Sequence, residues 1–281
     1  MGEALSWAET VVGQRVVSSR GLREGGAPWL LTYTDGTEAV LRGGEEGFVT
    51  EVAALRVAEE NGVPAPRLIA VGEGLMLLTV VAGSSKIPER ATAERLVALG
   101  AAAAGVHGVE MAPSKDLPVR RRPIELADFD RWRERDGASA LLVEAAAAVA
   151  EVAEPTGVSV FVHGDLWQGN TMWLDGALTS IVDWDCAGVG HPGVDLGSLR
   201  CDAELMFGGG AAAAVLTGWR QRAGRAAEDV AYWDVVAALA TPPDLTDWES
   251  TIQDQGRADL DGATLTARRD AFLRSALDSL S

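Results

Sequence analysis

The first third of the chain carries short apolar segments separated by turn residues. A short helix is expected over residues 3–12, and residues 16–44 read as strands joined at the pair Asp35-Gly36. Glycine tolerates the positive φ angles that hairpin turns need, so this pair predicts a β-hairpin. We predict two further strands, at residues 67–72 and 75–81. This region should therefore form a small antiparallel sheet.

One helix interrupts the sheet-rich region. Residues 45–62 show helical spacing of apolar positions and end at Gly62, just ahead of two prolines. A glycine at this place is typical of a helix end, and proline cannot continue a helix.

From about Pro88 onward the apolar pattern is mostly helical. The predicted helices cover residues 89–108, 138–152, 195–207, 211–224 and 229–240. Residues 158–182 differ, because short strands and the turn Asp175-Gly176 alternate there with polar loops. A chain of 281 residues is long for one compact unit. We therefore predict an α+β fold with two lobes, residues 1–82 and residues 83–281.

Composition narrows the possible functions. Hydrophobic residues make up 47% of the chain, enough for a sizeable core, and the formal charge of -17 leaves no basic patch for nucleic acid. Such a charge attracts cations instead. Cys186 and Cys201 are the only cysteines; one disulfide between them is possible in principle, but two reduced thiols in a cytoplasmic protein are expected. The N-terminus has no signal-peptide pattern, and no apolar run approaches a membrane span, so no membrane partner is expected.

Two polar loops carry the candidate chemistry. The segment HGDLWQGN places Asp165 directly after an apolar strand and Asn170 five residues later, with glycines that let the backbone approach a ligand. Asp183 then ends the next apolar strand. Mg²⁺ prefers oxygen ligands and is usually held by one or two carboxylates together with substrate phosphates. Phosphoryl transfer needs such a set, namely a carboxylate for the attacking hydroxyl and an oxygen-bound metal.

The sheet-rich lobe would have to supply a cation for the phosphates. In kinase-like folds this cation lies on the third strand and pairs with an acid on the next helix. No lysine precedes Lys86, so Arg42, at the end of its strand, is the candidate, with Glu51 as its partner. Arginine can bind phosphate through its bidentate fork.

The two loops resemble those of the aminoglycoside phosphotransferase family, relatives of the protein kinases. The HGDxxxxN loop of that family is matched in full by residues 163–170, and its D-[WF]-[DE] segment by residues 183–185. The G-x-G-x-P-x-x-D-L segment is matched by residues 188–196, and the similarity extends over roughly residues 14–240. Two features depart from the family pattern. Arg42 stands where many members have lysine, and the phosphate-covering loop has few glycines.

The resemblance implies a bilobal, protein-kinase-like fold and a role for each matching residue. Asp165 would be the catalytic base, and Asn170 and Asp183 would hold Mg²⁺. Arg42, oriented by Glu51, would contact the phosphates of ATP or GTP. The remaining nucleotide contacts would come from the phosphate-covering loop over residues 18–26, including Ser19, and from the backbone at Thr79 and Val81.

Several polar residues also have simpler structural interpretations. His163 is expected to bond to a backbone carbonyl rather than act as a base, and His107 to pack in the interior or to end a helix. Asp195 is expected to bind the backbone of the catalytic loop and to cap a helix. Trp167 is a core residue or part of the acceptor pocket. Seven acids of the helical region could recognise a cationic acceptor or simply face solvent: Asp202, Glu204, Asp229, Asp234, Asp244, Asp247 and Glu249.

Three functions remain open on the sequence. The first is a kinase that uses ATP or GTP to phosphorylate a hydroxyl of a small cationic antibiotic, an aminoglycoside or a basic peptide such as capreomycin or viomycin. The second is a metabolic kinase of choline or an amino sugar. The third is a nucleotide-binding pseudokinase, against which the presence of all three catalytic oxygens argues.

Overall fold

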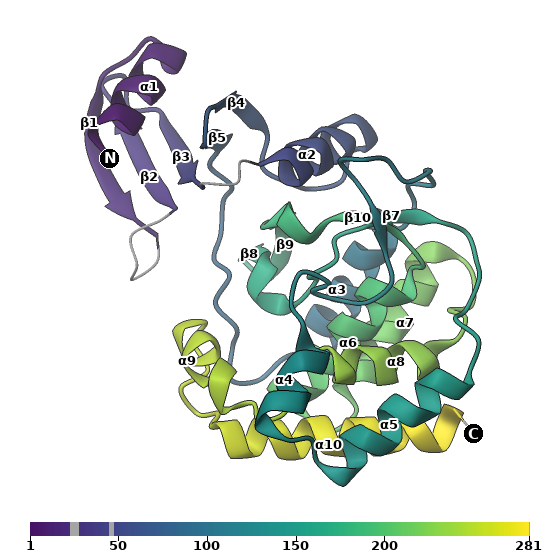
Figure 1. Cartoon of the computed structure of the whole chain (residues 1–281). Helices are drawn as coiled ribbons and strands as arrows, with labels where there is room; N and C mark the ends of the chain where they lie inside the picture. Colours follow the sequence, from purple (N-terminus) through teal and green to yellow (C-terminus); the bar gives the residue numbers. More distant parts are fainter. Residues whose placement is uncertain (23–27, 45–47, 281) are drawn as a thin grey trace.

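The chain folds into a sheet-rich N-terminal lobe and a larger helical lobe, joined by an extended linker (Figure 1). Figure 1 is a computed structural model, and the structure describes residues 1–22, 28–44 and 48–280. The predicted fold class is confirmed. The boundary between residues 82 and 83 stays a prediction.

The N-terminal lobe contains one antiparallel five-stranded sheet. The strands are β1 (Val16–Gly21), β2 (Trp29–Tyr33), β3 (Glu38–Gly43), β4 (Leu68–Gly72) and β5 (Leu75–Thr79), in the order β1-β2-β3-β5-β4. The helix α1 (Gly2–Val12) packs on β1 to β3 around a small core of its own. The predicted hairpin forms between β2 and β3, where the Asp35 carboxylate accepts hydrogen bonds from the backbone N–H and hydroxyl of Thr37.

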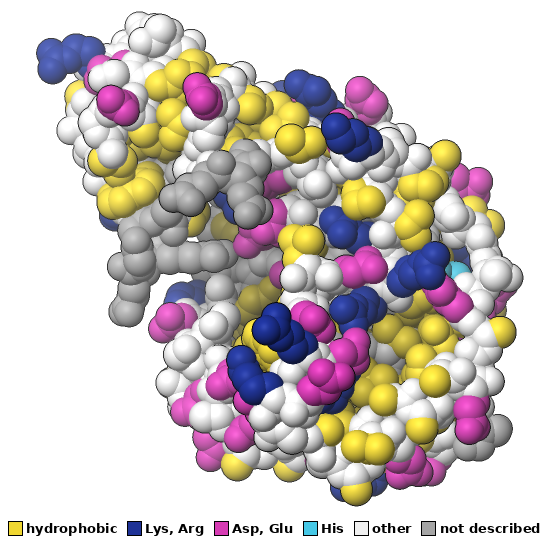
Figure 2. All heavy atoms as spheres, in the orientation of Figure 1, with side chains coloured by type: hydrophobic (Ala, Val, Ile, Leu, Met, Phe, Trp, Pro, Cys, Tyr) yellow, Lys and Arg dark blue, Asp and Glu magenta, His cyan; other side chains and the backbone are white. Residues whose placement is uncertain are grey.

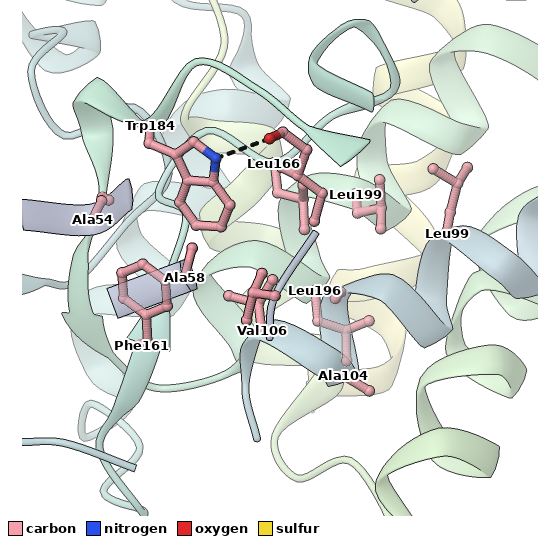
Figure 3. Close-up of a cluster of buried hydrophobic side chains, with 14 of the residues drawn as sticks. Ala54, Ala58, Leu99, Ala104, Val106, Phe161, Leu166, Trp184, Leu196 and Leu199 are labelled. Atoms are coloured by element: carbon pink, nitrogen blue, oxygen red, sulfur yellow. Dashed lines mark hydrogen bonds between the residues drawn. The ribbon is translucent and has the colours of Figure 1, made fainter. Parts of the chain in front are cut away.

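The helix α2 (Val49–Asn61) joins this lobe to the catalytic region. It ends at Gly62 as predicted, with φ at 69°; residues 45–47 of the predicted helix lie outside the described residues. Its small residues Ala54 and Ala58 face Phe161 and Trp184 of the helical lobe in one continuous core (Figure 3). The rings of Phe161 and Trp184 stack at 5.2 Å between centroids. Alanine allows this close approach, which brings Glu51, on the same helix, toward the polar loops.

Helices make up most of the C-terminal lobe. They are α3 (Ala93–Val106), α4 (Phe129–Asp136), α5 (Ala140–Glu151), α6 (Gly193–Phe207), α7 (Ala211–Ala223), α8 (Val230–Leu239), α9 (Thr246–Asp254) and α10 (Gly262–Leu280). The short strands are β6 (Val119–Arg120), β7 (Val160–Val162), β8 (Thr171–Leu174), β9 (Ala177–Ile181) and β10 (Gly188–Gly190). The five predicted helices are all present. The helices α4, α9 and α10 were not among those predicted.

Two glycines bring α3 and α7 into backbone contact. A Cβ on Gly100 would lie 1.8 Å from the carbonyl oxygen of Val215, and one on Gly218 would lie 1.9 Å from that of Val97. No side chain fits at either position. The close packing fixes the end of α3, where His107 contacts Asp195 on α6 and Trp219 on α7.

The linker between the lobes is bonded to the helical lobe along its length. Ser84 exchanges backbone hydrogen bonds of 2.9 and 3.0 Å with Trp173, in β8. The hydroxyl of Thr179, in β9, donates to the carbonyl of Ala82 at 2.6 Å. Further on, the backbone N–H of Ile87 donates to the carbonyl of Gln255, just after α9, at 2.7 Å. The linker therefore runs along β8 and β9 to the end of α9.

Candidate active site

The first polar loop leaves β7 through a turn that only glycine can make. Gly164 has φ at 80°, and a Cβ there would lie 2.1 Å from the carbonyl oxygen of Cys186. His163, before it, donates from Nε2 to the carbonyl of Val182 at 2.9 Å, as expected for a structural histidine. Its Nδ1 accepts from the backbone N–H of Asp165 at 3.3 Å. Burial lowers the pKa of His163 and so favours this neutral ring.

Asp195, on α6, holds this loop in place through its carboxylate. Its fully buried carboxylate accepts hydrogen bonds from the backbone N–H groups of His163, at 2.7 Å, and Gly164, at 2.8 Å. The predicted backbone contact is thus present. The expectation of a helix cap is wrong, because α6 starts at Gly193 and Asp195 lies within its first turn.

A buried chain of side chains continues behind Asp195. The indole N–H of Trp219 donates to Nδ1 of His107 at 2.9 Å, and Nε2 of His107 lies 3.1 Å from Asp195. An indole N–H can only donate, so the His107 proton must be on Nε2, facing Asp195. Burial alone would raise the pKa of Asp195, but the hydrogen bonds from His107 and from the loop backbone hold it below its ordinary value.

The next residues bring Asp165 and Asn170 into contact. The 3-10 turn Gln168–Asn170 folds the loop back, so that Nδ2 of Asn170 donates to the carbonyl oxygen of Asp165 at 2.9 Å and to its Oδ2 at 3.1 Å. Because the amide nitrogen is used in this way, the amide oxygen of Asn170 is the atom that can face a cation.

The second polar loop delivers Asp183 to the same place. Asp183 adopts a left-handed conformation, with φ at 66° and ψ at 64°, between β9 and the turn Trp184–Cys186. This geometry is costly for a residue other than glycine, and such residues cluster at functional sites. Asp183 Oδ1 lies 3.0 Å from Nη1 of Arg42.

Arg42 connects the two lobes at this point. It lies on β3, and its Nη1 is also 2.5 Å from Oε1 of the buried Glu51, in α2. The predicted pair is therefore formed, and Arg42 joins Glu51 to Asp183. Burial raises the pKa of Glu51 to about 7, although the charge of Arg42 opposes this rise.

Negative charge is concentrated around Asp165. Burial, followed by the carboxylates of Asp183 and Asp185, raises the pKa of Asp165 to about 8. A divalent cation would relieve this repulsion. Within the described residues no group of three or more His, Cys, Asp or Glu side chains could hold a metal. The two oxygen ligands Asn170 and Asp183 instead suit Mg²⁺, which takes its other ligands from water and phosphate.

The remaining predicted nucleotide residues lie around the N-terminal sheet. Ser19 is exposed on β1, opposite Leu31. Thr79 ends β5, and its hydroxyl oxygen accepts from the backbone N–H of Arg67 at 2.9 Å; Val81 follows in the linker. Residues 23–26 of the predicted phosphate-covering loop lie outside the described residues. The structure thus forms two groups of side-chain contacts, Asp165 with Asn170 and Arg42 with Glu51 and Asp183, and between them the backbone N–H of Val182 donates to the carbonyl of Asn170 at 2.9 Å. Ser19, Thr79 and Val81 are not part of this contact network.

A cavity of about 350 Å³ opens beside Asp165 in the helical lobe. Its walls come from α4, α6, α8, α9 and the first polar loop. They include Trp167, which was a candidate for the acceptor pocket. Ligand pockets commonly range from about 300 to 1,000 Å³. The size and the presence of Asp165 make this cavity the candidate acceptor site.

Of the seven acids considered for acceptor binding, Asp202 lines this cavity. The others are engaged or exposed elsewhere: Asp234 pairs with Arg200 at 2.8 Å, and Glu204 accepts from the backbone of Ala212 at 3.0 Å. Asp244 accepts from Thr246, and Glu249 from Gly262. Asp and Glu side chains also lie in separate places over the face of the molecule in Figure 2. Of these seven acids, Asp202 is therefore the one that is placed to contact an acceptor in the cavity.

Sequence reasoning missed two parts of the site. His107 was expected to pack in the interior or to end a helix, and it does both, but its bonds to Trp219 and Asp195 had no signal in the sequence. That Asp202, of the seven acids, lines the cavity was not predicted either. Its one local clue is its place seven residues, about two helical turns, after Asp195 on α6.

The comparisons identify the family of the chain. Residues 20–239 match the model of the phosphotransferase enzyme family. The chain therefore belongs to this family, and it is a phosphotransferase, as predicted. The comparison with curated proteins returned no match.

Solved structures of similar fold cover nearly the whole chain. The macrolide 2'-phosphotransferase MphH from Brachybacterium faecium, an apoenzyme, has a TM-score of 0.64 and 19% identity, over 99% of this chain and 98% of that chain. A putative fructosamine-3-kinase from Thermobifida fusca has a TM-score of 0.65 and 18% identity, over 99% of both chains. The aminoglycoside phosphotransferase APH(4)-Ia, in a ternary complex with AMP-PNP and hygromycin B, has a TM-score of 0.63 and 16% identity, over 98% and 99%. At these identities the likeness shows the fold alone.

A search of the described helices for a membrane span found none that is long and apolar enough.

Proposed function

We propose that this phosphotransferase transfers the γ-phosphoryl group of ATP or GTP to a hydroxyl of a small molecule. The observation that carries the proposal is the arrangement of two bonded groups, Asp165 with Asn170 and Asp183 with Arg42 and Glu51, which the backbone bond from Val182 to Asn170 brings together. These are the groups that phosphoryl transfer needs, and Asp165 lines a cavity that can hold an acceptor.

The chemical step is a displacement at phosphorus. The acceptor oxygen forms a bond to the γ-phosphorus while the bond from phosphorus to the β,γ-bridging oxygen breaks. The bridging oxygen keeps the electron pair and leaves on the nucleoside diphosphate. Asp165, which lines the cavity, orients the hydroxyl and takes its proton in the ionised form, which the positive charge of a bound Mg²⁺ would favour. No covalent enzyme intermediate is involved.

The other residues position the phosphates. Asn170 and Asp183 would hold Mg²⁺, which supplies positive charge to the phosphate oxygens. Arg42 would contact the phosphates, and Glu51 fixes its guanidinium through the 2.5 Å contact. Ser19 and the backbone at Thr79 and Val81 would complete the nucleotide site. These last three roles rest on the family resemblance, since the residues lie outside the contact network.

The proposed role is antibiotic inactivation. Two of the similar folds belong to a macrolide phosphotransferase and to an enzyme bound to hygromycin B, which supports this role. The putative fructosamine-3-kinase favours a second candidate, a metabolic kinase of an amino sugar or choline. The two cysteines are free and buried, which suits the cytoplasm as the proposed compartment.

Product analysis tests the proposal. The full chain is incubated with Mg²⁺, ATP or GTP, and a panel of antibiotics and metabolic hydroxyl compounds, and mass spectrometry detects a phosphate added to the acceptor. Asp165→Asn should lower the rate by about 10²- to 10⁴-fold, the usual contribution of a positioned acid or base. It should leave nucleotide binding intact.

Asp175→Asn provides the matched control. Asp175 is an exposed turn residue between β8 and β9, and asparagine tolerates its positive φ of 51°. This variant should keep full activity. If the wild-type chain binds nucleotide but phosphorylates no acceptor, the pseudokinase interpretation replaces the proposal.

A further inference from the structure

The acceptor cavity has a mostly apolar wall. Leu205, Met206 and Ile252 line it together with several aromatic rings. Four rings take part: Phe129, Trp132, Trp167 and Trp248. Polar acceptor groups pressed against such walls would lose their hydrogen bonds to water without replacement. The cavity therefore favours a ligand with a substantial apolar body.

Two carboxylates interrupt this wall. Asp165 and Asp202 are the charged residues among the described residues that line the cavity, and no lysine, arginine or histidine lines it. Asp165 has the catalytic task proposed above. Asp202 is thus the negative group left for recognising an acceptor.

Asp202 is held in place by the catalytic loop itself. The backbone N–H and the side-chain amide of Gln168 donate to its Oδ2 at 3.3 and 3.1 Å. Both bonds end on Oδ2, so within the described part of the chain Oδ1 keeps its capacity to accept a bond from a ligand. Asp202 is 8% exposed. Water and salt therefore screen an ion pair at this residue far less than one at the surface.

We infer that the acceptor is an amphiphile with one basic nitrogen. Its apolar body lies against the aromatic and aliphatic wall, its ammonium group pairs with Asp202, and its reacting hydroxyl meets Asp165. This inference rests on the proposed function and narrows its acceptor class. The aromatic rings add to the attraction, since a cation near an aromatic face is stabilised.

Two other classes of cation fit the cavity less well. A polycationic aminoglycoside brings several ammonium groups and many hydroxyls, whereas the cavity offers one unassigned carboxylate and few polar partners. Choline has the single charge but no apolar body to fill a space of about 350 Å³.

Binding measurements on the full chain test the inference without requiring turnover. The probes are a macrolide with one amino sugar, the same macrolide with its nitrogen acylated and uncharged, the aminoglycoside kanamycin, and choline. Calorimetry gives each dissociation constant for the wild type, for Asp202→Asn, and for Asp247→Asn as a control. Asp247 is an exposed acid on α9, outside the cavity lining.

The wild type should bind the charged macrolide most tightly, about 10- to 100-fold better than its acylated analogue, because acylation removes the positive charge that would pair with Asp202. Asp202→Asn should remove most of that difference, and Asp247→Asn should retain it. Asparagine can still accept from Gln168, so the loop should keep its conformation.

Three results would overturn the inference. Kanamycin or choline could bind at least as tightly as the macrolide. The acylated macrolide could bind as well as the charged one. Asp202→Asn could weaken both macrolides equally, which would show that Asp202 acts only through Gln168. The proposed function is judged separately, by phosphate transfer to any acceptor in the mass-spectrometric assay, so either claim can fail while the other stands.

Discussion

The catalytic loops and the acceptor cavity adjoin at Asp165, yet they are built in opposite ways. The loops are two short, continuous segments, and their polar groups are bonded to fixed partners such as Asp195 and Asn170. The cavity is assembled from side chains of several helices that are far apart in the sequence. Phosphate and metal chemistry demands particular residues at particular spacings, whereas an apolar wall can be made from many residues. The catalytic chemistry can therefore be predicted from short segments of the sequence, but the choice of acceptor depends on tertiary packing.

The largest loss of stability is expected from adding one methyl group to the first polar loop, at Gly164. Gly164→Ala would place a Cβ 2.1 Å from the carbonyl oxygen of Cys186, in addition to the strain of a positive φ. We expect a loss of about 2–5 kcal/mol in the free energy of unfolding, the sum of the φ strain and the overpacking. Urea denaturation measures this loss.

Gly176→Ala separates the two contributions. Gly176 has nearly the same φ, 81° against 80°, but no atom lies within 4 Å of its Cβ position. This variant should lose only about 1–2 kcal/mol, the cost of the backbone conformation. Equal losses for the two variants would mean that contact with Cys186 does not constrain the loop.

A smaller loss of stability is expected when the hydrogen bond from Trp219 to His107 is removed. Trp219→Phe keeps the aromatic packing but removes the indole N–H that bonds to His107 at 2.9 Å. The buried Nδ1 of His107 then lacks a donor, which should lower the free energy of unfolding by about 1–3 kcal/mol. Trp132→Phe, in the cavity wall and outside this hydrogen-bonded chain, should cost less. Unchanged stability in Trp219→Phe would contradict the hydrogen-bonded chain to Asp195.

The smallest expected effect is a pH dependence in the cavity. Burial raises the pKa of Asp202 to about 6, while hydrogen bonds from Gln168 and the charges of Arg257 and Arg95 oppose the rise. A protonated Asp202 cannot pair with an ammonium group. Affinity for the charged macrolide should therefore fall roughly tenfold from pH 7 to pH 5. Asp165, the other carboxylate of the cavity, has a pKa near 8, so it is already largely protonated over that range.

At Asp202, acidification has opposite effects on ligand binding and on the stability of the fold. The folded state holds the Asp202 proton more tightly than the unfolded chain does, so acidification from pH 6 to pH 4 favours the folded state at this residue. Weaker binding at pH 5 should thus occur without a loss of stability from Asp202. The acylated macrolide and the Asp202→Asn variant should show no such pH dependence.

Much of the fold could be predicted from the sequence because its signals are local. Asp35-Gly36 and Gly62 marked a hairpin and a helix end correctly, and apolar spacing located five helices of the larger lobe. The helices α4, α9 and α10 were missed where the apolar pattern was weak, as in α4, which is mostly charged. The pairing of Arg42 with Glu51 was expected, but its extension to Asp183 needed the packing of α2 on Trp184. No sequence pattern could separate Asp202 from the six acids that face elsewhere.

The route of the linker has a thermodynamic consequence. The segment that follows Val81 is bonded to β8 at Ser84 and, through Ile87, to Gln255 at the end of α9, and α9 supplies Trp248 and Ile252 to the cavity wall. One continuous span of backbone thus connects the proposed nucleotide contacts at Thr79 and Val81 with the helix α9, which lines the cavity. If occupancy of one side changes the position of that span, the affinity of the other side changes, and reciprocity requires the same factor in both directions. Cooperative binding of the two substrates would then be a property of the chain that joins their sites.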